Sequence, residues 1–322
     1  MSETAQKFVM LGYGVAAFAL VVGVILLLAD LAPRRGRDTI QVALFMGPAA
    51  LLVTAGLIVP AVRTTILAFK DSIGEKWVGF DNFAWLFTDA DIRSVLQNTA
   101  VWVALAPLAA TGIGLLYAIL VDGSRFESFY KALIFLPMAI SMVGASIIWR
   151  FVYDYQEVGD QVGLLNQVLI AVHLSPQRFV QDPPWNTLYL IVILVWIQAG
   201  FAMVILSAAI KGIPADIVEA ARLDGVNPVQ MFVRITLPSI RTSVVVVYLT
   251  IFITTLKVFD IVRTMTADKF GGSVIANEMY NQVFVRSQDG QGFALAVFLF
   301  VLVIPVVVFQ VRVLRRARME IR

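Results

Sequence analysis

The chain has 322 residues, of which 59% are hydrophobic and only 15% are charged. A soluble domain carries about a quarter charged residues, so this composition predicts a membrane protein. Cysteine is absent, which excludes disulfides, thiolate chemistry and cysteine-ligated metals, and the single His173 offers no histidine cluster for a metal. The formal net charge of +3 says little by itself, so the placement of the charges matters more.

Seven apolar runs are long enough to cross a bilayer, which takes about 20 residues of helix. They cover roughly 8–29, 42–68, 99–121, 132–152, 187–210, 243–261 and 293–311. Strands of a β-barrel alternate and give no such runs, so the expected fold class is all-α, a polytopic helical membrane protein. The first run is too long for a signal peptide and lacks a cationic head. We therefore expect an extra helix and a basic linker at 1–41, followed by a main domain at 42–322.

Lysine and arginine are concentrated on one set of loops. The segments 30–41, 121–131, 211–242 and 312–322 carry 14 basic residues in about 66 positions, and ten others lie on the longer loops of the opposite side. Because positive residues favour the cytoplasmic side, we expect these four segments in the cytoplasm and the N-terminus outside.

The polar stretch at 211–242 has specific local chemistry. Pro214 can open a helix, and Gly225 can end it in the left-handed conformation. Asn227, which a proline follows, suits the N-cap of a second short helix, and Pro238 prevents that helix from running on. The pattern predicts an elbow of two helices joined by a tight turn.

This elbow carries a recognisable signature. Its residues are Glu219, Ala220, Ala221, Asp224, Gly225, Ile235, Leu237 and Pro238. At this spacing they resemble the EAA motif of bacterial ABC importer permeases, and the likeness extends over roughly 42–314. Within that family the chain is most similar to the MalF-like carbohydrate branch, especially alpha-glucoside permeases, through PMAIS at 137–141, GASIIW at 144–149 and IQAGFAM at 197–203. The resemblance implies the six-helix core of MalF and MalG.

The resemblance also implies partners in a bacterial cytoplasmic membrane. They are a second, MalG-like permease subunit, two MalK-like ABC ATPase subunits and an extracytoplasmic sugar-binding protein, with no nucleic acid. The chain has no G-x-x-x-x-G-K-[ST] phosphate loop, so we expect no enzyme activity and no cofactor on this chain, with ATP and Mg bound by the partner ATPase. Glu219 would pair with a basic group of the ATPase, while Ala220 and Ala221 would permit close approach. Physical chemistry alone favours an ordinary solvated loop in which Asp216, Glu219 and Arg222 make weak surface pairs, and it is the spacing of the whole signature that favours coupling.

Polar and aromatic residues inside the spans are candidates for the transport path. Gln198 and Phe201 share a helix face ahead of the elbow, and Thr250, Thr254 and Thr255 lie on the span after it. The resemblance places all but Thr250 near the sugar-contacting positions of maltose permeases. The alternative for each is helix–helix packing through its hydroxyl or amide group.

Lys257 and Asp260 are unusual because they are ionisable and fall within an apolar run. Three residues apart, they would share a helix face and could pair. We expect either a gate or a structural ion pair. No metal site is expected.

Two outer stretches and the function itself leave alternatives open. Residues 70–93 carry five aromatic side chains, which suit either an interfacial belt or a docking surface, and residues 274–284 form an amphipathic stretch expected to lie along the outer surface. The favoured function is uptake of an alpha-glucoside of the maltose, trehalose or sucrose type. The alternatives are an ion-coupled secondary transporter and an ABC permease for a non-sugar solute such as glycerol phosphate.

Overall fold

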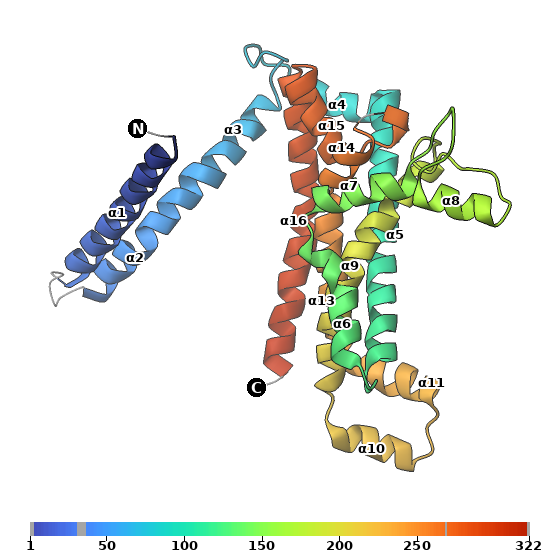
Figure 1. The fold of residues 1–322 in the computed structure, drawn as a ribbon. Helices are drawn as coiled ribbons and strands as arrows, with labels where there is room; N and C mark the ends of the chain where they lie inside the picture. The colour runs from blue at the N-terminus through green and yellow to red at the C-terminus, as the bar shows by residue number, and fades with distance from the viewer. Residues whose placement is uncertain (1–2, 31–36, 268, 321–322) are drawn as a thin grey trace. The chain divides into compact units, whose positions relative to one another are not determined.

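The computed structural model describes residues 3–30, 37–267 and 269–320. They are mostly helical, with an isolated antiparallel bridge between Lys70 and Trp77. The elements are α1 (Glu3–Asp30), α2 (Arg37–Val53), η1 (Thr54–Ile58), α3 (Val59–Leu67), α4 (Asp81–Thr88), α5 (Ala90–Val121), α6 (Glu127–Phe135), η2 (Leu136–Ala139), α7 (Met142–Tyr153), α8 (Leu164–Ala171), α9 (Trp185–Lys211), α10 (Ala215–Leu223), α11 (Pro228–Met231), η3 (Phe232–Thr236), α12 (Leu237–Ser239), α13 (Arg241–Leu256), α14 (Asp260–Met265), η4 (Lys269–Gly271), α15 (Ile275–Tyr280), η5 (Asn281–Val285) and α16 (Asp289–Glu320). Figure 1 shows their course.

The chain divides into two compact units, Met1–Ile66 and Leu67–Arg322. In the first unit α1 packs against α2, and α2, η1 and α3 follow one another without a break. This boundary differs from the one expected at residue 41, because the second apolar run belongs with the first. Residues 31–36 of the predicted basic linker lie outside the described residues.

Among the described residues, five helices are long and apolar enough to cross a membrane, and two bent helix pairs could raise the number to seven. The five are Gln6–Val24, Gln41–Leu67, Ala90–Val121, Trp185–Lys211 and Asp289–Arg315. Each coincides with one of the predicted apolar runs. The sequence therefore identified these five membrane-length helices correctly.

The two remaining runs are not single straight helices. The run at 132–152 is broken, and the helices on either side of the break are bent by 100°. Pro137 lies in the last turn before the break, and Ile140 is extended. The Ser141 hydroxyl then accepts a hydrogen bond from the Gly144 amide and starts α7 anew. In the run at 243–261 the helix ends early, at Leu256, and Lys257 forms its C-cap.

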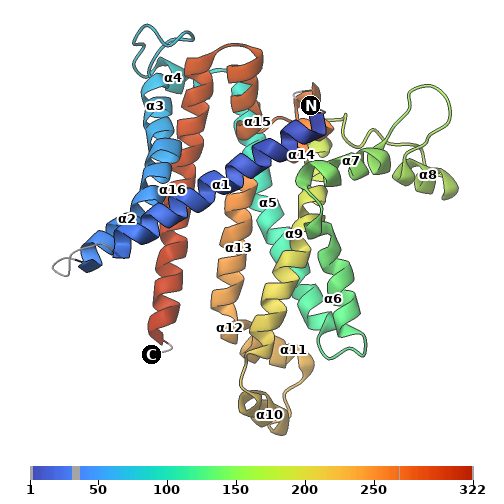
Figure 2. The same cartoon turned by 60° about the vertical axis from the view of Figure 1, so that its left-hand side comes forward.

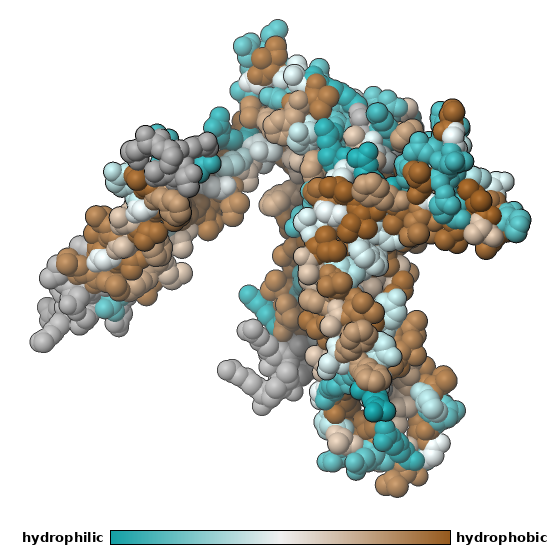
Figure 3. Space-filling view, viewed as in Figure 1, coloured by the Kyte–Doolittle hydropathy of each residue, from teal (hydrophilic) through white to brown (hydrophobic). Residues whose placement is uncertain are grey.

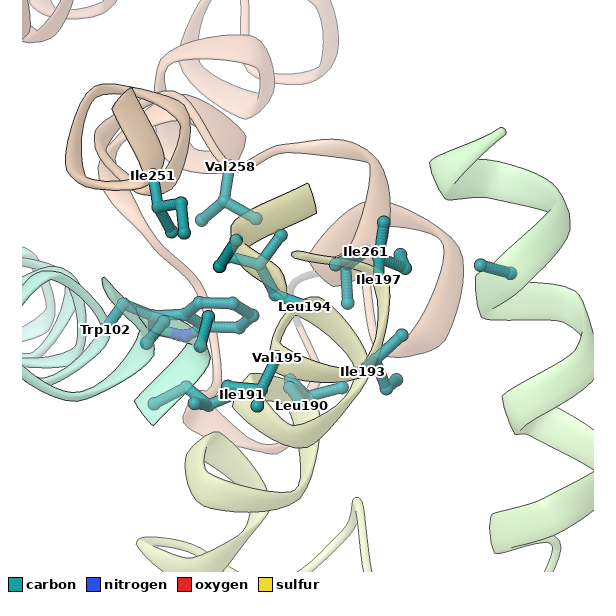
Figure 4. Packing of buried hydrophobic residues seen from close by; sticks show 14 of the residues in the cluster. Trp102, Leu190, Ile191, Ile193, Leu194, Val195, Ile197, Ile251, Val258 and Ile261 are labelled. Atoms are coloured by element: carbon teal, nitrogen blue, oxygen red, sulfur yellow. The ribbon is translucent and has the colours of Figure 1, made fainter. Parts of the chain in front are cut away.

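The second unit is built around α5 and α9. Trp102 on α5 is fully buried and points toward Ile191 and Leu194 on α9 (Figure 4). Ile251 on α13 completes this part of the core. Gly114 lies at a close contact between α5 and α9, where a Cβ would be 2.4 Å from Ala202 Cβ, so this contact relies on a small residue, as is common between membrane helices.

Most of the stretch at 274–284 is buried, although Phe284 at its end is 70% exposed. Ile275, Asn277 and Glu278 of α15 are buried, and Asn281 and Gln282 of η5 are buried as well. The amphipathic pattern arises because its apolar residues pack against α16 while its polar residues bond with one another and with nearby loops. The expectation of a surface helix was wrong.

The second unit has two polar ends. α10, α11, the α5–α6 turn and the C-terminal end of α16 lie at one end, and α4 and α15 lie at the other (Figures 1 and 2). In Figure 3 brown residues cover much of the middle of this unit, and teal residues gather toward both ends. The basic segments at 121–131, 211–242 and the start of 312–322 thus share one end, as the distribution of positive charge predicted.

Candidate coupling elbow and translocation path

The elbow begins with α10, which follows α9 after three residues. Pro214 occupies the N-cap with an extended backbone, and Asp216 lies in the first turn, where a negative charge favours the helix dipole. Arg222 lies in the last turn, where a positive charge is favoured. The predicted helix is therefore present, with the predicted proline at its start.

The turn after α10 has the geometry of a Schellman motif. Gly225 has a φ of +75°, its amide bonds to the Arg222 carbonyl at 3.1 Å, and the Val226 amide bonds to the Ala221 carbonyl at 3.2 Å. A Cβ at Gly225 would meet no atom within 4 Å, so its backbone conformation, not the available space, favours glycine.

The second helix of the elbow starts with a capping box. The Asn227 side chain accepts from the Gln230 amide at 2.8 Å, and the Gln230 side chain accepts from the Asn227 amide at 3.1 Å. This helix continues through the π-helical turn η3 into α12. It ends at Ser239, one residue beyond Pro238. The next helix, α13, leaves at an angle of 70°, so the expected interruption at Pro238 is confirmed.

The elbow leaves much of its surface open. Leu223 is 88% exposed and Val229 is 71% exposed, and Ile217 and Val233 are also exposed. Figure 1 shows α10 standing away from the helices of the bundle. An isolated loop gains nothing by exposing four large apolar side chains, so this surface is suited to contact with another protein.

The signature residues divide between this open surface and the inside of the elbow. Glu219, Ala220, Asp224, Gly225 and Pro238 are exposed, Ile235 and Leu237 are half-buried, and Ala221 is buried. Ala221 therefore packs within the elbow, and only Ala220 of the two alanines is open to an approaching partner.

Gln198 has the clearest properties of a path residue. Its side chain is only 8% exposed, and its amide group makes no hydrogen bond with any described residue. The amide atoms are not among the completely buried polar atoms that lack a partner, so they keep some exposure, and a ligand or a water molecule can bond to them. Phe201 on the same helix is half-buried.

The three threonines on α13 bond within their own helix. The hydroxyls of Thr250, Thr254 and Thr255 donate to carbonyls four residues earlier, at 2.8–3.0 Å. Thr255 is completely buried, and Thr250 also accepts a bond from Gln310 on α16 at 3.1 Å. Thr250 therefore joins two helices. Thr254 is half-buried, so its side chain is more exposed than that of Thr255.

Lys257 and Asp260 do not share a helix. α13 ends at Leu256, Lys257 forms its C-cap, and Asp260 is the first residue of α14. The ion pairs of the described residues include neither side chain. The expected structural ion pair is wrong, because the backbone leaves the helical path between the two residues; a role in gating stays a prediction.

An ion-pair cluster at the elbow end of the bundle was not predicted. It consists of Asp122, Glu127, Lys131, Ser207 and Lys211, which we call the Glu127 cluster. Glu127 Oε1 lies 2.6 Å from Lys131 Nζ and 2.5 Å from Lys211 Nζ. The i, i+4 spacing of Glu127 and Lys131 was visible in the sequence, but their partners on α9 are about 80 residues away.

A bundle of membrane-length helices with an exposed elbow at one polar end is the architecture of a multi-pass membrane protein. Residues 110–319 match the family described as "Binding-protein-dependent transport system inner membrane component". The chain belongs to this family of ABC transporter permeases. Membership argues against the ion-coupled secondary transporter considered above.

Two known permeases and one solved transporter structure are similar to this chain over most of its length. The chain is 42% identical to the alpha-glucoside transport system permease protein AglF of Rhizobium meliloti over 85% of this chain and 82% of that protein. It is 43% identical to the osmoprotective compounds uptake permease protein GgtC of Synechocystis, over 84% of this chain and 97% of the relative. A bacterial alginate ABC transporter, solved with a pentasaccharide-bound periplasmic protein, contains a chain of the same fold, with a TM-score of 0.76, 23% identity, and coverage of 88% of this chain and 98% of that one.

Proposed function

We propose that this chain forms one half of the pore of an ATP-driven importer for an alpha-glucoside or a related oligosaccharide. A second, related permease would form the other half, and two separate ATPase subunits would supply the energy. A solute-binding protein outside the membrane would deliver the sugar. The elbow and the C-terminus would then lie in the cytoplasm, and the N-terminus outside, in a bacterial cytoplasmic membrane.

The observation that carries this proposal is the capped, apolar surface of the elbow. Two short helices are fixed by a Schellman turn and a capping box, yet Leu223 and Val229 remain open. Burying a side chain of this size in a groove yields roughly 1.5–3 kcal/mol. A rigid helix with such a face suits the helix-in-groove mode of recognition, and the groove would belong to the ATPase.

The proposal is tested by purifying the complex through a tag on this chain. We expect an ATPase and a second permease to copurify, and the ATP hydrolysis of the reconstituted complex to rise when binding protein loaded with maltose, trehalose or sucrose is added. Uptake that proceeds in vesicles without ATP would refute the proposal.

The elbow contact has its own matched test. Leu223→Asp places a charge on the open face and should abolish copurification of the ATPase. Ile73→Asp is the control, because Ile73 is 76% exposed and lies in the 70–93 segment near the opposite end of the unit. Equal recovery of ATPase with both variants would contradict a docking role for the elbow.

A second candidate solute class follows from the relative named for osmoprotective compounds. Under this alternative, the importer would carry a small osmoprotective solute rather than an oligosaccharide. Adding glycine betaine to the panel of loaded binding proteins separates the two. Stimulation by trehalose and sucrose but not by glycine betaine favours a sugar importer, and the reverse favours uptake of non-sugar osmoprotectants.

A further inference from the structure

The Glu127 cluster joins α6 to the end of α9 from which the elbow starts. Lys131 Nζ donates to Ser207 Oγ at 2.5 Å, and Lys211 Nζ lies 3.8 Å from Asp122 Oδ1. Glu127 and Lys131 are one turn apart on α6, and Ser207 and Lys211 are one turn apart on α9. The two helices are thus linked by side chains over a full turn.

Glu127 is the centre of this cluster. Its carboxylate accepts from both lysines, and its second oxygen accepts from the Gly123 amide at 3.3 Å. Its side chain is only 20% exposed, so water screens these contacts less than it would on an open surface. Without this carboxylate, two ammonium groups would face each other at the end of the bundle.

The same two helices also touch nearer the middle of the bundle. A Cβ at Gly200 on α9 would lie 2.5 Å from the Ile134 carbonyl oxygen and 3.0 Å from Phe135 Cα on α6. The backbones are therefore in direct contact there. With the Glu127 cluster at one point and Gly200 at the other, α6 is fixed to α9 along its length.

This arrangement connects a displacement of α10 to α9, α6 and the bend before α7. Only Gly212, Ile213 and Pro214 separate Lys211 from α10, so a movement of α10 reaches the end of α9 at Lys211. α6 leads into the 100° bend before α7, and α7 packs against α14 near the opposite end of the unit.

We propose that Glu127 is a positioning residue for coupling: it locks α6 to α9, so that displacement of the elbow moves α6 and the bend before α7 together with α9. The proposal rests on the proposed function, because it assumes that a partner displaces α10. It assigns a role to the basic segment at 121–131, which the elbow signature does not include.

The test uses the complete complex in proteoliposomes and measures sugar transported per ATP hydrolysed. Glu127→Gln and Lys211→Met should each lower this ratio about fivefold, the scale of roughly one kcal/mol. The double variant should be no worse than either single variant, because both remove one interaction. Glu157→Gln is the control, since Glu157 pairs with Arg178 at 3.6 Å in an outer loop and is exposed. Its ratio should stay within twofold of the wild type.

Exchanging the charges of Glu127 and Lys211 distinguishes a positioning role of Glu127 from a role in stability alone. Glu127→Lys combined with Lys211→Glu moves the carboxylate from α6 to α9 and keeps two cations beside it, one of them Lys131. This variant should recover at least half of the wild-type ratio and should assemble even if Glu127→Gln does not. A ratio within twofold of wild type for Glu127→Gln, or an exchange variant no better than the single variants, would overturn the proposal. A wild-type complex that couples no transport to ATP would instead refute the proposed function.

Discussion

The contact at Gly114 allows the packing of the two central helices to be tested by a single methyl group. A Cβ at Gly114 would lie 2.4 Å from Ala202 Cβ, 2.8 Å from the Ala199 carbonyl oxygen and 2.9 Å from the Met203 amide nitrogen. Two of these three atoms belong to the backbone of α9 and cannot move without the helix. Gly112, on the same helix, has nothing within 4 Å of the corresponding position.

The magnitude follows from these distances. Overpacking by one methyl group costs about 1–3 kcal/mol, and here it forces α5 and α9 apart. In an open helix the same substitution stabilises by about 0.5–1 kcal/mol, through the lower helix propensity of glycine. Because both variants gain this propensity, it cancels, and we expect Gly114→Ala to be less stable than Gly112→Ala by the overpacking cost alone, roughly 1–3 kcal/mol.

The assay is thermal unfolding of the purified protein in one detergent, followed by the loss of the monodisperse peak on size exclusion. At roughly 2–4 °C per kcal/mol, Gly114→Ala should unfold at least about 2 °C below Gly112→Ala. Equal unfolding temperatures would show that α5 and α9 are not in the close contact described here.

Three further predictions concern the elbow, the path and the charged pair. Gly225→Val should weaken coupling more than Gly225→Asn. A β-branched residue resists a φ of +75°, at a cost of about 1–2 kcal/mol, whereas asparagine tolerates this conformation. The amount of ATPase that copurifies with each variant measures the difference. Gln198→Leu should raise the Km of uptake without lowering the unfolding temperature, whereas Thr250→Val should lower that temperature, by the loss of a helix–helix bond worth about 0.6 kcal/mol. Lys257→Met and Asp260→Asn should have additive effects on uptake, within about 0.5 kcal/mol, since the two side chains form no ion pair.

Each of these has an outcome that contradicts it. Equal ATPase recovery from the valine and asparagine variants would mean that the left-handed turn is not required. A lower unfolding temperature for Gln198→Leu, with unchanged uptake, would make Gln198 a packing residue. A double variant of Lys257 and Asp260 no worse than either single one would indicate a direct interaction that forms in another conformation.

The sequence alone determined the features that depend on neighbours along the chain. The long apolar helices follow from composition, because about 20 apolar residues form a helix in a bilayer regardless of what surrounds them. The elbow follows from capping chemistry, in which the side chains of Asn227 and Gln230 and the backbone freedom of Gly225 act within a few residues. The resemblance of the elbow to the ABC permease signature was visible for the same reason.

Tertiary structure decided the features that depend on distant partners. Hydropathy did not reveal the break before α7 or the end of α13 at Leu256, since apolar residues lie on both sides of each. The separation of Lys257 from Asp260 follows from that helix end. Glu127 could be recognised as the centre of a cluster only after α6 and α9 were placed side by side, because the lysine and the serine that complete it lie some 80 residues further along the chain.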